Sequence, residues 1–587
     1  MSAAPAAPRQ TEQPGSLAAS YRDALDQLTN ERAAARLFDR DVSLWNVPRE
    51  HHAVIRNRLG WLDAPAWLAE RGNELRAFAA GIRAEGFTRV LLLGMGGSSL
   101  APEVLQRTLR AGPGAPTLEV LDSTDPAAVR GAVGRGRLER TLIVVASKSG
   151  STVETRSQYR ALRAEVDGAG LAEPGRNFVA VTDEGSSLDA LAASEGFRAV
   201  FRNPPDIGGR YSALSYFGML PTALLGLDLD DAVARAARAR EGCRAASPAA
   251  NSALRLGAFL AGAAKAGRDK MTLLLPGALR PFGYWVEQLV AESTGKEGRG
   301  IVPVEGEPLG PAHHYGDDRV FVFVTLEGAP DPDLDRLRAD LESAGAPCVR
   351  IALPDPEELA GEFYRWEAAT AFAGALLSID PFDEPNVQES KDATQRILAA
   401  LARDGRLPEE PARTTDAGIG IAAGAPVWER LTSGLTAHPS LEAVLQRFLA
   451  LAAPDDYAAV LAYVERTAET ESAFALLRRA VRNGTHLPVL QGYGPRYLHS
   501  SGQLHKGGPK SGLFLVVTAD PEPDRDVAIP GSPYTFGQLQ RAQALGDLES
   551  LAAHGKPALR LHLGTDVAEG LRKVNEAVER AVAARVG

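Results

Sequence analysis

The sequence of 587 residues contains only two cysteines, Cys243 and Cys348, and neither stands in a paired spacing such as CxxC. Two isolated cysteines exclude a disulfide framework and a cysteine-based metal site, and they are typical of a protein of the reducing cytoplasm. Long apolar runs are also missing, since a membrane-spanning helix needs about 20 apolar residues in a row. We therefore expect a cytoplasmic protein with no membrane partner.

Excess positive charge is lacking as well. The formal net charge is −10 and the isoelectric point is about 5.6. Nucleic-acid-binding proteins usually carry a basic face, so we expect no nucleic-acid partner. An anionic metabolite is not excluded, because a few local cations and helix N-termini can bind one.

The first 16 residues, MSAAPAAPRQTEQPGS, lack the basic region and the apolar run of a signal peptide. Their composition predicts a disordered tail. From residue 17 to 85 the pattern is largely that of helices. The first predicted strand follows this helical region.

Short β-branched runs alternate with helix-length segments from residue 88 to 225, namely RVLLLG, TLEVLD, TLIVVAS and FVAVT. A second alternating region begins at MTLLLP and continues through VFVFVTL and PCVRIALP, and later strand candidates are HLPVLQGY and GLFLVVT. Such alternation is typical of βαβ units around a parallel sheet. The sequence predicts an α/β protein with doubly wound parallel sheets.

At about 150 residues per domain, a chain of this length is expected to form two to four domains. The predicted divisions are a tail over 1–16, a helical region with the first sheet over 17–245, a second sheet domain over 246–403 and an extra α/β segment over 404–587. The sequence leaves open whether the last segment is a separate domain or an elaboration of the second.

Two loops that follow predicted strands are rich in small or hydroxyl residues. The first, GMGGSS, offers Gly96, Gly97 and Ser98 to a ligand at the start of a predicted helix. It is not the dinucleotide fingerprint, because Ser99 stands where that pattern requires its third glycine. A tight turn without a ligand would have a similar sequence, and this alternative stays open.

The second loop, SKSGST, combines four hydroxyls with one cation at a predicted helix N-terminus, in the residues Ser147, Lys148, Ser149, Ser151 and Thr152. A helix cap would need only one hydroxyl. A phosphate group has several oxygens that accept hydrogen bonds, and it suits this cluster better. The spacing is not that of a nucleotide-binding P-loop, so we predict a phosphate site of another kind.

GMGGSS followed by SKSGST resembles the sugar-isomerase (SIS) domain, which binds phosphosugars. Three later motifs resemble those of the phosphoglucose isomerase family, namely GGRYS at 208–212, ESTGK at 292–296, and DPFDEP at 380–385 with Lys391 following. The resemblance implies two SIS-type domains and the interconversion of glucose 6-phosphate and fructose 6-phosphate. It also implies that no cofactor and no metal is needed, and that the chain forms a homodimer with its sites near the interface.

The same resemblance assigns roles to residues. It implies that Glu292 is the base that moves a proton through an enediol and that Arg210 stabilises the negative charge. The apolar neighbours of Glu292 predict burial and a raised pKa. Gln288 lies one helical turn earlier on the same face and could orient substrate or base. Opening of the sugar ring implies Lys391 together with a histidine.

Two places compete for that histidine. LHSSGQ, which contains His499, resembles a family segment but follows Lys391, the reverse of the usual order. His313 or His314 lies where a count from ESTGK would place it, but its neighbours do not match. We favour His499. Its order and the extra segment resemble the isomerase half of fused transaldolase–phosphoglucose isomerase proteins, although a transaldolase barrel of about 250 residues has no room here.

Glu384 stands where the family usually has glutamine, and we leave it out of the predicted site. Two alternative functions stay open: an isomerase that also accepts mannose 6-phosphate, and a non-catalytic SIS protein that senses sugar phosphates. A sensor needs the hydroxyl loop but no base. The combination of Glu292, Arg210 and Lys391 therefore favours an enzyme.

Overall fold

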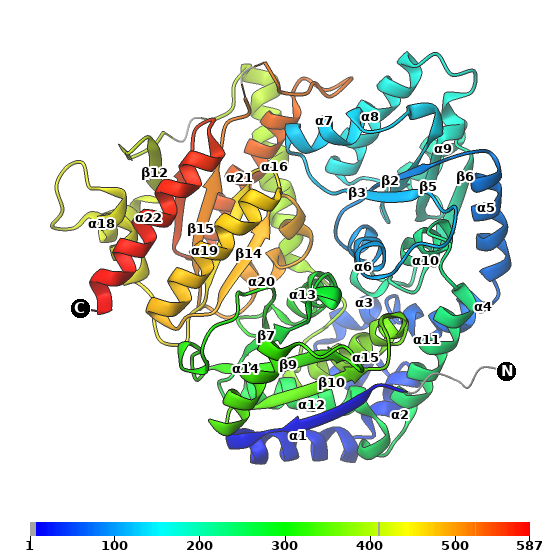
Figure 1. Cartoon of the computed structure of the whole chain (residues 1–587), viewed down its shortest axis with the longest axis horizontal. Coiled ribbons are helices and arrows are strands. Elements are labelled where there is room, and N and C mark those ends of the chain that lie inside the picture. The colour runs from blue at the N-terminus through cyan, green and yellow to red at the C-terminus, as the bar shows by residue number, and fades with distance from the viewer. Residues whose placement is uncertain (1–6, 409–410, 523, 587) are drawn as a thin grey trace.

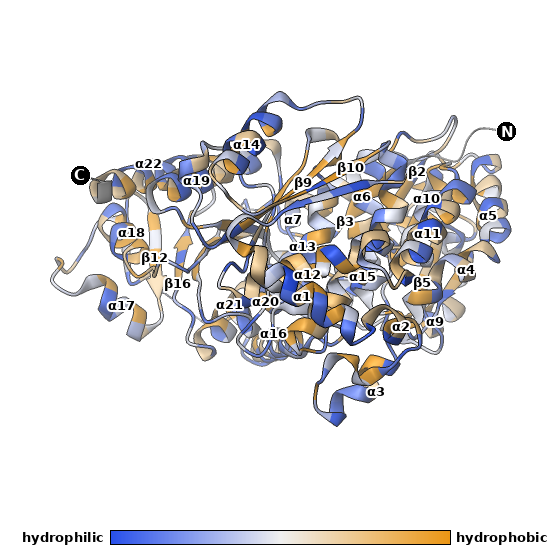
Figure 2. Ribbon diagram, turned by 90° about the horizontal axis from the view of Figure 1, so that it is seen from below, coloured by the Kyte–Doolittle hydropathy of each residue, from blue (hydrophilic) through white to orange (hydrophobic). Residues whose placement is uncertain are grey.

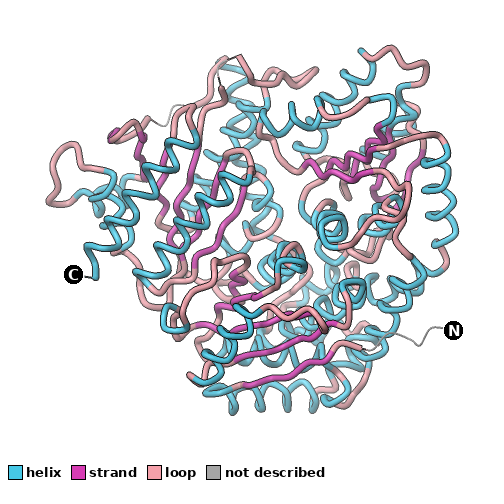
Figure 3. The backbone as a smooth tube through the Cα atoms, in the orientation of Figure 1, coloured by secondary structure: helices cyan, strands magenta, loops and turns pink. Residues whose placement is uncertain are grey.

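The computed structural model describes residues 7–408, 411–522 and 524–586, and its strands form three separate sheets (Figures 1 and 3). Helices connect the parallel strands in all three sheets, as the alternating pattern predicts. The α/β class is confirmed. The boundaries of the predicted domains remain a prediction.

The first sheet is wholly parallel, in the order β3-β2-β4-β5-β6. Its strands are β2 (Arg89–Leu93), β3 (Thr117–Leu121), β4 (Thr141–Ala146), β5 (Phe178–Asp183) and β6 (Ala199–Asn203). β2 and β4 are buried along their whole length, as their continuous apolar runs predict. The order reverses between these two strands, and at such a point the carboxyl ends of the strands form a crevice that binds ligands. Both predicted loops follow these strands.

The second sheet has the order β1-β10-β9-β7-β8. Its strands are β1 (Arg9–Gln13), β7 (Lys270–Leu274), β8 (Val302–Val304), β9 (Arg319–Leu326) and β10 (Cys348–Leu353). β1 pairs antiparallel with β10 at the edge of the sheet. The predicted disordered tail over 1–16 is therefore wrong for Arg9–Gln13, since the ladder with β10 orders this polar segment. Residues 1–6 lie outside the described residues.

The third sheet has the order β11-β12-β16-β15-β13-β14. Its strands are β11 (Thr414–Asp416), β12 (Ile419–Ala423), β13 (Ala458–Tyr463), β14 (Val489–Tyr493), β15 (Leu513–Thr518) and β16 (Ala558–His562). β11 and β12 form a hairpin whose two loop residues, Ala417 and Gly418, both have positive φ. A two-residue loop of this kind matches the twist of the two strands. The stretch from about residue 404 to 426, which is rich in glycine, alanine and proline, thus contains an ordered hairpin.

Helices fill the space between and around the sheets. The predicted helical region holds α1 (Ala18–Asn30), α2 (Ala33–Phe38), α3 (His52–Arg56), α4 (Ala64–Ala69) and α5 (Gly72–Ala84). The first sheet is followed or connected by α6 (Leu100–Thr108), α7 (Pro126–Gly134), α8 (Val153–Gly168), α9 (Ser187–Ser194), α10 (Tyr216–Leu224) and α11 (Leu229–Arg244). The second sheet has α12 (Ser252–Lys265), α13 (Phe282–Thr294), α14 (Pro332–Ser343) and α15 (Leu359–Leu377).

The remaining helices are α16 (Pro385–Asp404), α17 (Ala425–Thr432), α18 (Leu441–Leu449), α19 (Ala468–Thr485), α20 (Gly502–Gly507), α21 (Phe536–Ala553) and α22 (Val567–Val586). α15 is buried at every residue and packs against α11, α12 and α13. Peripheral helices such as α5 and α22 carry hydrophilic and hydrophobic residues together (Figure 2). Among the helices of the described residues, none has the length and apolar content to cross a bilayer.

Candidate active site

The SKSGST loop lies at the N-terminus of α8, at the point where the strand order of the first sheet reverses. The Ser147 and Thr152 hydroxyl oxygens are 3.0 Å apart, and the Ser149 and Ser151 hydroxyl oxygens are 2.9 Å apart. The Gly150 N–H donates to the Ser147 hydroxyl at 3.1 Å. The hydroxyls therefore gather at the positive end of a long helix, where an anion is stabilised.

Lys148 belongs to this loop, but its ammonium group has other partners. It donates to a carboxylate oxygen of Asp183 and, at 2.9 Å, to the carbonyl oxygen of Pro205. Its charge is thus paired with Asp183 at the end of the neighbouring strand β5. The structure brings the four hydroxyls together and directs the lysine toward an acid.

The GMGGSS loop lies against two other loops, and its glycines allow this approach. A Cβ atom on Gly96 would lie 2.6 Å from the carbonyl oxygen of His499, and one on Gly97 would lie 1.9 Å from that of Gly209. Gly96 also has φ of +55°, which favours glycine. Ser98, the next residue of the loop, is buried. The loop joins the GGRYS and LHSSGQ segments in space.

Glu292 lies near the end of α13 and is only 8% exposed. One carboxylate oxygen accepts from the Gln288 amide at 3.0 Å, and the other lies 3.4 Å from an Nη atom of Arg210. Burial raises the pKa of Glu292 above its ordinary value, and the charge of Arg210 opposes that rise. The predicted burial and the predicted direction of the pKa shift are both present in the structure.

The Arg210 guanidinium is buried and all of its groups have partners. Nε donates to the Ser293 hydroxyl at 2.8 Å, and Nη2 donates to the carbonyl oxygens of Pro381 and Asp383, each at 2.8 Å. Nη1 donates to Glu384 at 2.9 Å, besides its ion pair with Glu292. Glu384, which we left out of the predicted site, therefore shares the guanidinium with the candidate base.

His499 links the first sheet to α13. Its Nε2 atom lies 3.0 Å from a carboxylate oxygen of Glu154, and its carbonyl oxygen accepts from Gln288 at 2.8 Å. The Gln543 amide donates to the same oxygen of Glu154 at 2.7 Å. Burial alone would raise the pKa of Glu154, but His499 and Lys391 lower it below its ordinary value. Sequence reasoning missed both Glu154, two residues past the hydroxyl loop, and Gln543, which no motif marks.

A cavity of about 430 Å³ lies beside His499. Among the residues that line it are Ser151, Thr152, Glu154, Lys391, His499 and Gln543. Part of the hydroxyl loop, the candidate lysine on α16 and the favoured histidine thus face one space. Glu292 and Arg210 lie next to this group through Gln288 and do not line the cavity themselves.

The competing histidines lie elsewhere. His313 and His314 end a short 3-10 turn after β8. The ring of His314 lies 6.4 Å, centroid to centroid, from that of His486 at the end of α19. Within the described residues, the neighbours of His314 are His313 and residues of the α19 end, and none of them belongs to the predicted site around Glu292 and the hydroxyl loop.

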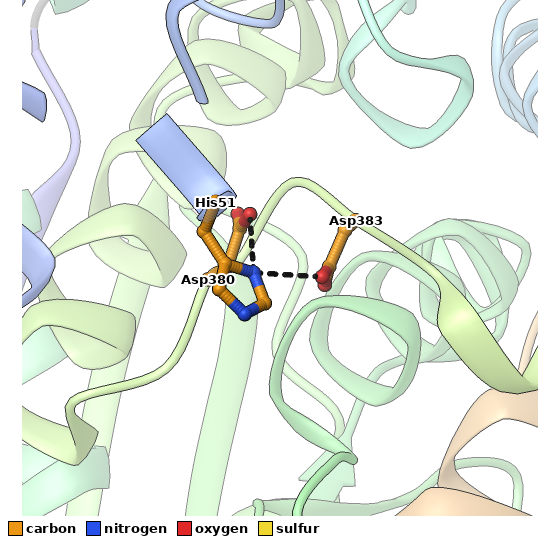
Figure 4. A group of neighbouring side chains, drawn as sticks. All are labelled: His51, Asp380 and Asp383. Carbon is orange, nitrogen blue, oxygen red and sulfur yellow. Dashed lines mark ion pairs between the residues drawn. The ribbon is translucent and has the colours of Figure 1, made fainter. Parts of the chain in front are cut away.

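His51, Asp380 and Asp383 are the one group of described residues arranged as possible metal ligands (Figure 4). The His51 Nδ1 atom lies 3.4 Å from Asp380 and 3.2 Å from Asp383. Lys296 donates to Asp383 at 2.6 Å and to the carbonyl oxygen of Asp380 at 2.7 Å. A lysine therefore already balances this acidic pair. The group holds the 380–383 segment, whose carbonyl groups bind Arg210.

Comparison with known sequences identifies the family. The phosphoglucose isomerase family model matches residues 71–301. A glucose-6-phosphate isomerase from Thermosynechococcus vestitus is 31% identical over 379 residues, which cover 58% of this chain and 71% of that protein. One from Rubrobacter xylanophilus is 29% identical over 373 residues, which cover 55% of this chain and 85% of that protein.

Solved structures agree in fold. A hypothetical protein from Thermus thermophilus superposes with a TM-score of 0.57 at 26% identity, covering 67% of this chain and 100% of that one. A glucose-6-phosphate isomerase from Chlamydia trachomatis gives a TM-score of 0.50 at 20% identity, covering 65% and 86%. The identity and coverage of the sequence relatives lead to a plain conclusion: the chain belongs to the phosphoglucose isomerase family.

Proposed function

We propose that this chain is a glucose-6-phosphate isomerase, which interconverts glucose 6-phosphate and fructose 6-phosphate. Membership of the family supports the reaction class. The observation that carries the proposal is the buried carboxylate of Glu292, held between the Gln288 amide and the Arg210 guanidinium. Isomerisation needs one group that takes a proton from C2 and returns it to C1, and a positioned carboxylate does this.

Glu292 is the proposed base. Its raised pKa makes it a better proton acceptor than an exposed carboxylate. Gln288 binds one carboxylate oxygen, and we assign proton abstraction to the second oxygen, which forms an ion pair with Arg210 at 3.4 Å. The proton removed from C2 leaves a cis-enediolate, and delivery of the proton to C1 completes the aldose-to-ketose conversion.

Arg210 is proposed to stabilise the enediolate through its charge. Its N–H groups are already bound by Ser293, Glu384 and backbone carbonyl oxygens. Its contribution is therefore electrostatic. The charge is effective because the distance is short and the poorly solvated site screens it little. Glu384 reduces that charge, so its carboxylate tunes both Arg210 and Glu292.

The hydroxyl loop is proposed to hold the substrate phosphate. Ser151 and Thr152 line the cavity, and Ser147 and Ser149 hold their hydroxyls in place. The N-terminus of α8 adds backbone N–H groups and a positive dipole end. Gly96, Gly97 and Ser98 are proposed to shape the adjoining wall, and Lys148 to stabilise the loop through Asp183.

Ring opening is proposed for His499 and Lys391, which both line the cavity. Glu154 holds the His499 ring in position through Nε2, so the ring's Nδ1 atom is the one available to the sugar. The Lys391 ammonium can stabilise the hydroxyl oxygen that develops charge when the ring opens. This assignment favours His499 over His313 and His314, neither of which is among the described residues that line the cavity.

Two other functions are less well supported. A sensor of sugar phosphates would need the hydroxyl loop but not a buried carboxylate beside an arginine. An isomerase that also accepts mannose 6-phosphate would use the same residues, and no observed contact favours it. The homodimer and the cytoplasmic location suggested by the sequence remain predictions.

The direct test is a coupled assay in which fructose 6-phosphate is supplied and glucose 6-phosphate is oxidised by a dehydrogenase. Mannose 6-phosphate is supplied in a parallel assay. We expect turnover of fructose 6-phosphate without added metal, and much slower turnover of mannose 6-phosphate. Equal rates would favour the dual-specificity alternative, and no turnover of either sugar would favour the sensor.

A further inference from the structure

The second and third sheets share one plan. In each, four parallel strands lie in the chain order second, first, third, fourth, and an antiparallel strand pairs with the fourth. The matching strands are β7, β8, β9 and β10 with β1, and β13, β14, β15 and β16 with β12. Helices α13, α14 and α15 match α19, α21 and α22 in order. The first sheet has the same order in its first four strands, β3-β2-β4-β5, but its outermost strand β6 is parallel and follows β5 in the chain.

The two units also have short sequence matches. The peptide DLES occurs at 340–343 and again at 547–550. After it, Gly345, Pro347, Arg350 and Leu353 have the same spacing as Gly555, Pro557, Arg560 and Leu563. In the third strand of each sheet, Phe321, Val324 and Thr325 match Phe514, Val517 and Thr518.

The register of the strands agrees with this alignment. Cys348, one residue after Pro347, pairs with Phe321. Ala558, one residue after Pro557, pairs with Phe514. A shift of one residue would turn every side chain to the other face of the sheet, so an equal register in both sheets requires a matched pattern throughout.

The two units contact each other reciprocally. Gln288 of α13 donates to the backbone carbonyl of His499 in the loop after β14. Arg478 of the matching helix α19 donates to the backbone carbonyls of Glu305 and Gly306, at 2.6 and 2.8 Å, in the loop after β8. Contacts in which each unit presents the same surface to the other are those of a two-fold dimer.

One buried apolar cluster contains residues of both units. Val302 and Val304 of β8 share one buried cluster with Leu490 of β14, and with Tyr497 and Leu504 of the segment after it. The edge strands β8 and β14 lie against each other there, and the two sheets are neighbours in Figure 1. A shared core of this kind is typical of obligate association.

A 3-10 turn that ends in a histidine follows the edge strand in both units, ending at His314 in one and at His499 in the other. Only His499 contacts a helix of the first, wholly parallel sheet: its ring binds Glu154 on α8. Among the described residues there is one wholly parallel sheet of this kind, the first sheet, and its helix α6 contacts α13. The two histidines that competed in the sequence therefore occupy equivalent places in two related units.

We propose that the third α/β segment is an internal copy of the second, and that it supplies within one chain the part of the active site that a second subunit would supply in a two-fold dimer. One chain then holds one complete site, built from the hydroxyl loop, Glu292 and His499. The equivalent place at His314 holds none. The roles of Glu292 and His499 rest on the proposed function, whereas the duplication does not.

Complementation between two full-length variants tests this proposal. Glu292→Gln and His499→Ala are co-expressed with different affinity tags, purified together and assayed for isomerisation, with each variant alone as control. We expect activity no higher than the sum of the two single variants, because neither chain holds an intact site. If a site were shared between chains, random pairing would leave about one quarter of the sites intact, and recovery of that fraction would overturn the proposal.

Two further measurements keep the test decisive. If His499→Ala lowers the melting temperature, His499→Gln replaces it. Sedimentation of the wild type with and without 6-phosphogluconate gives a readout independent of turnover. At protein concentrations where any dimer is partly dissociated, a site within one chain leaves the mass unchanged by the ligand, whereas a site shared between chains couples ligand binding to association. Inactivity of the wild type would reject the proposed function, and ligand-driven association would reject the in-chain site.

Discussion

The Gln288 side-chain amide donates two hydrogen bonds, to the Glu292 carboxylate at 3.0 Å and to the His499 backbone carbonyl at 2.8 Å. It thereby joins the proposed base to the segment that carries the proposed ring-opening histidine, 211 positions away in sequence. A single side chain therefore aligns the two halves of the proposed reaction.

Replacing Glu292 by Gln is expected to reduce kcat by about 10²–10⁴, the usual contribution of a general base. The phosphate loop is untouched, so the inhibition constant for 6-phosphogluconate should change little. In deuterated water the wild type should incorporate deuterium at C1 or C2 during turnover, and the variant should lose this exchange. Activity within a few-fold of the wild type would assign the base to another residue.

Replacing Glu384 by Gln is expected to move the acid limb of kcat/KM to lower pH. The Glu384 carboxylate raises the pKa of Glu292, so its removal lets the base stay ionised in more acidic solution. Glu389→Gln, which removes an acid within the first turns of α16, is the matched control. A shift of the limb to higher pH would mean that Glu384 does not act on Glu292.

Replacing Ser151 and Thr152 together by Ala is expected to raise the KM of both substrates at least about tenfold, because two hydrogen bonds to a charged group are lost. Binding of 6-phosphogluconate should weaken in parallel. Ser472→Ala, which removes an exposed hydroxyl of α19, serves as control. Unchanged phosphate affinity would place the phosphate elsewhere.

Replacing His499 by Ala is expected to slow turnover of the cyclic sugar at least about tenfold, whereas an open-chain substrate analogue should react at nearly the wild-type rate. His314→Ala should leave both rates unchanged. The difference between the two substrates separates ring opening from general damage to the site. The opposite ranking of the two variants would return the role to His314.

Replacing Glu287 by Gln is expected to flatten the dependence of stability on pH. Burial raises the pKa of Glu287 to about 8. The folded state therefore holds a proton that the unfolded state has released between about pH 4.5 and 8, and stability falls as pH rises through this window. Urea unfolding at pH 5 and pH 8 should show a loss on the order of a few kcal/mol in the wild type and a smaller one in Glu287→Gln. Equal losses would contradict a protonated Glu287.

Sequence reasoning succeeded where local signals were strong. The strands RVLLL and TLIVVA and the helices after them are confirmed as β2, β4, α6 and α8. After their first residues, Arg89 and Thr141, these runs are apolar, and glycine or serine follows each of them, so strand and turn signals coincide. The family motifs located Glu292 and Arg210, which the structure places 3.4 Å apart.

It failed where structure depends on distant partners. β1 consists of the polar residues RQTEQ, and only its pairing with β10, more than 300 positions later, makes it a strand. Gln543 binds Glu154 across 389 positions, so no local pattern could have revealed it. The repeat of the second unit in the third was also missed, because few residues are identical and the match becomes plain only from strand order and register.

The N-terminal strand also has a consequence for handling the protein. β1 covers one edge of β10, whose residues are largely apolar. An N-terminus that looks like a tail is routinely removed. Removing residues 1–16 would leave the backbone N–H and C=O groups of that edge of β10 without partners. Exposed edges of this kind template pairing with other chains. We expect such a variant to lose solubility before it loses its active site.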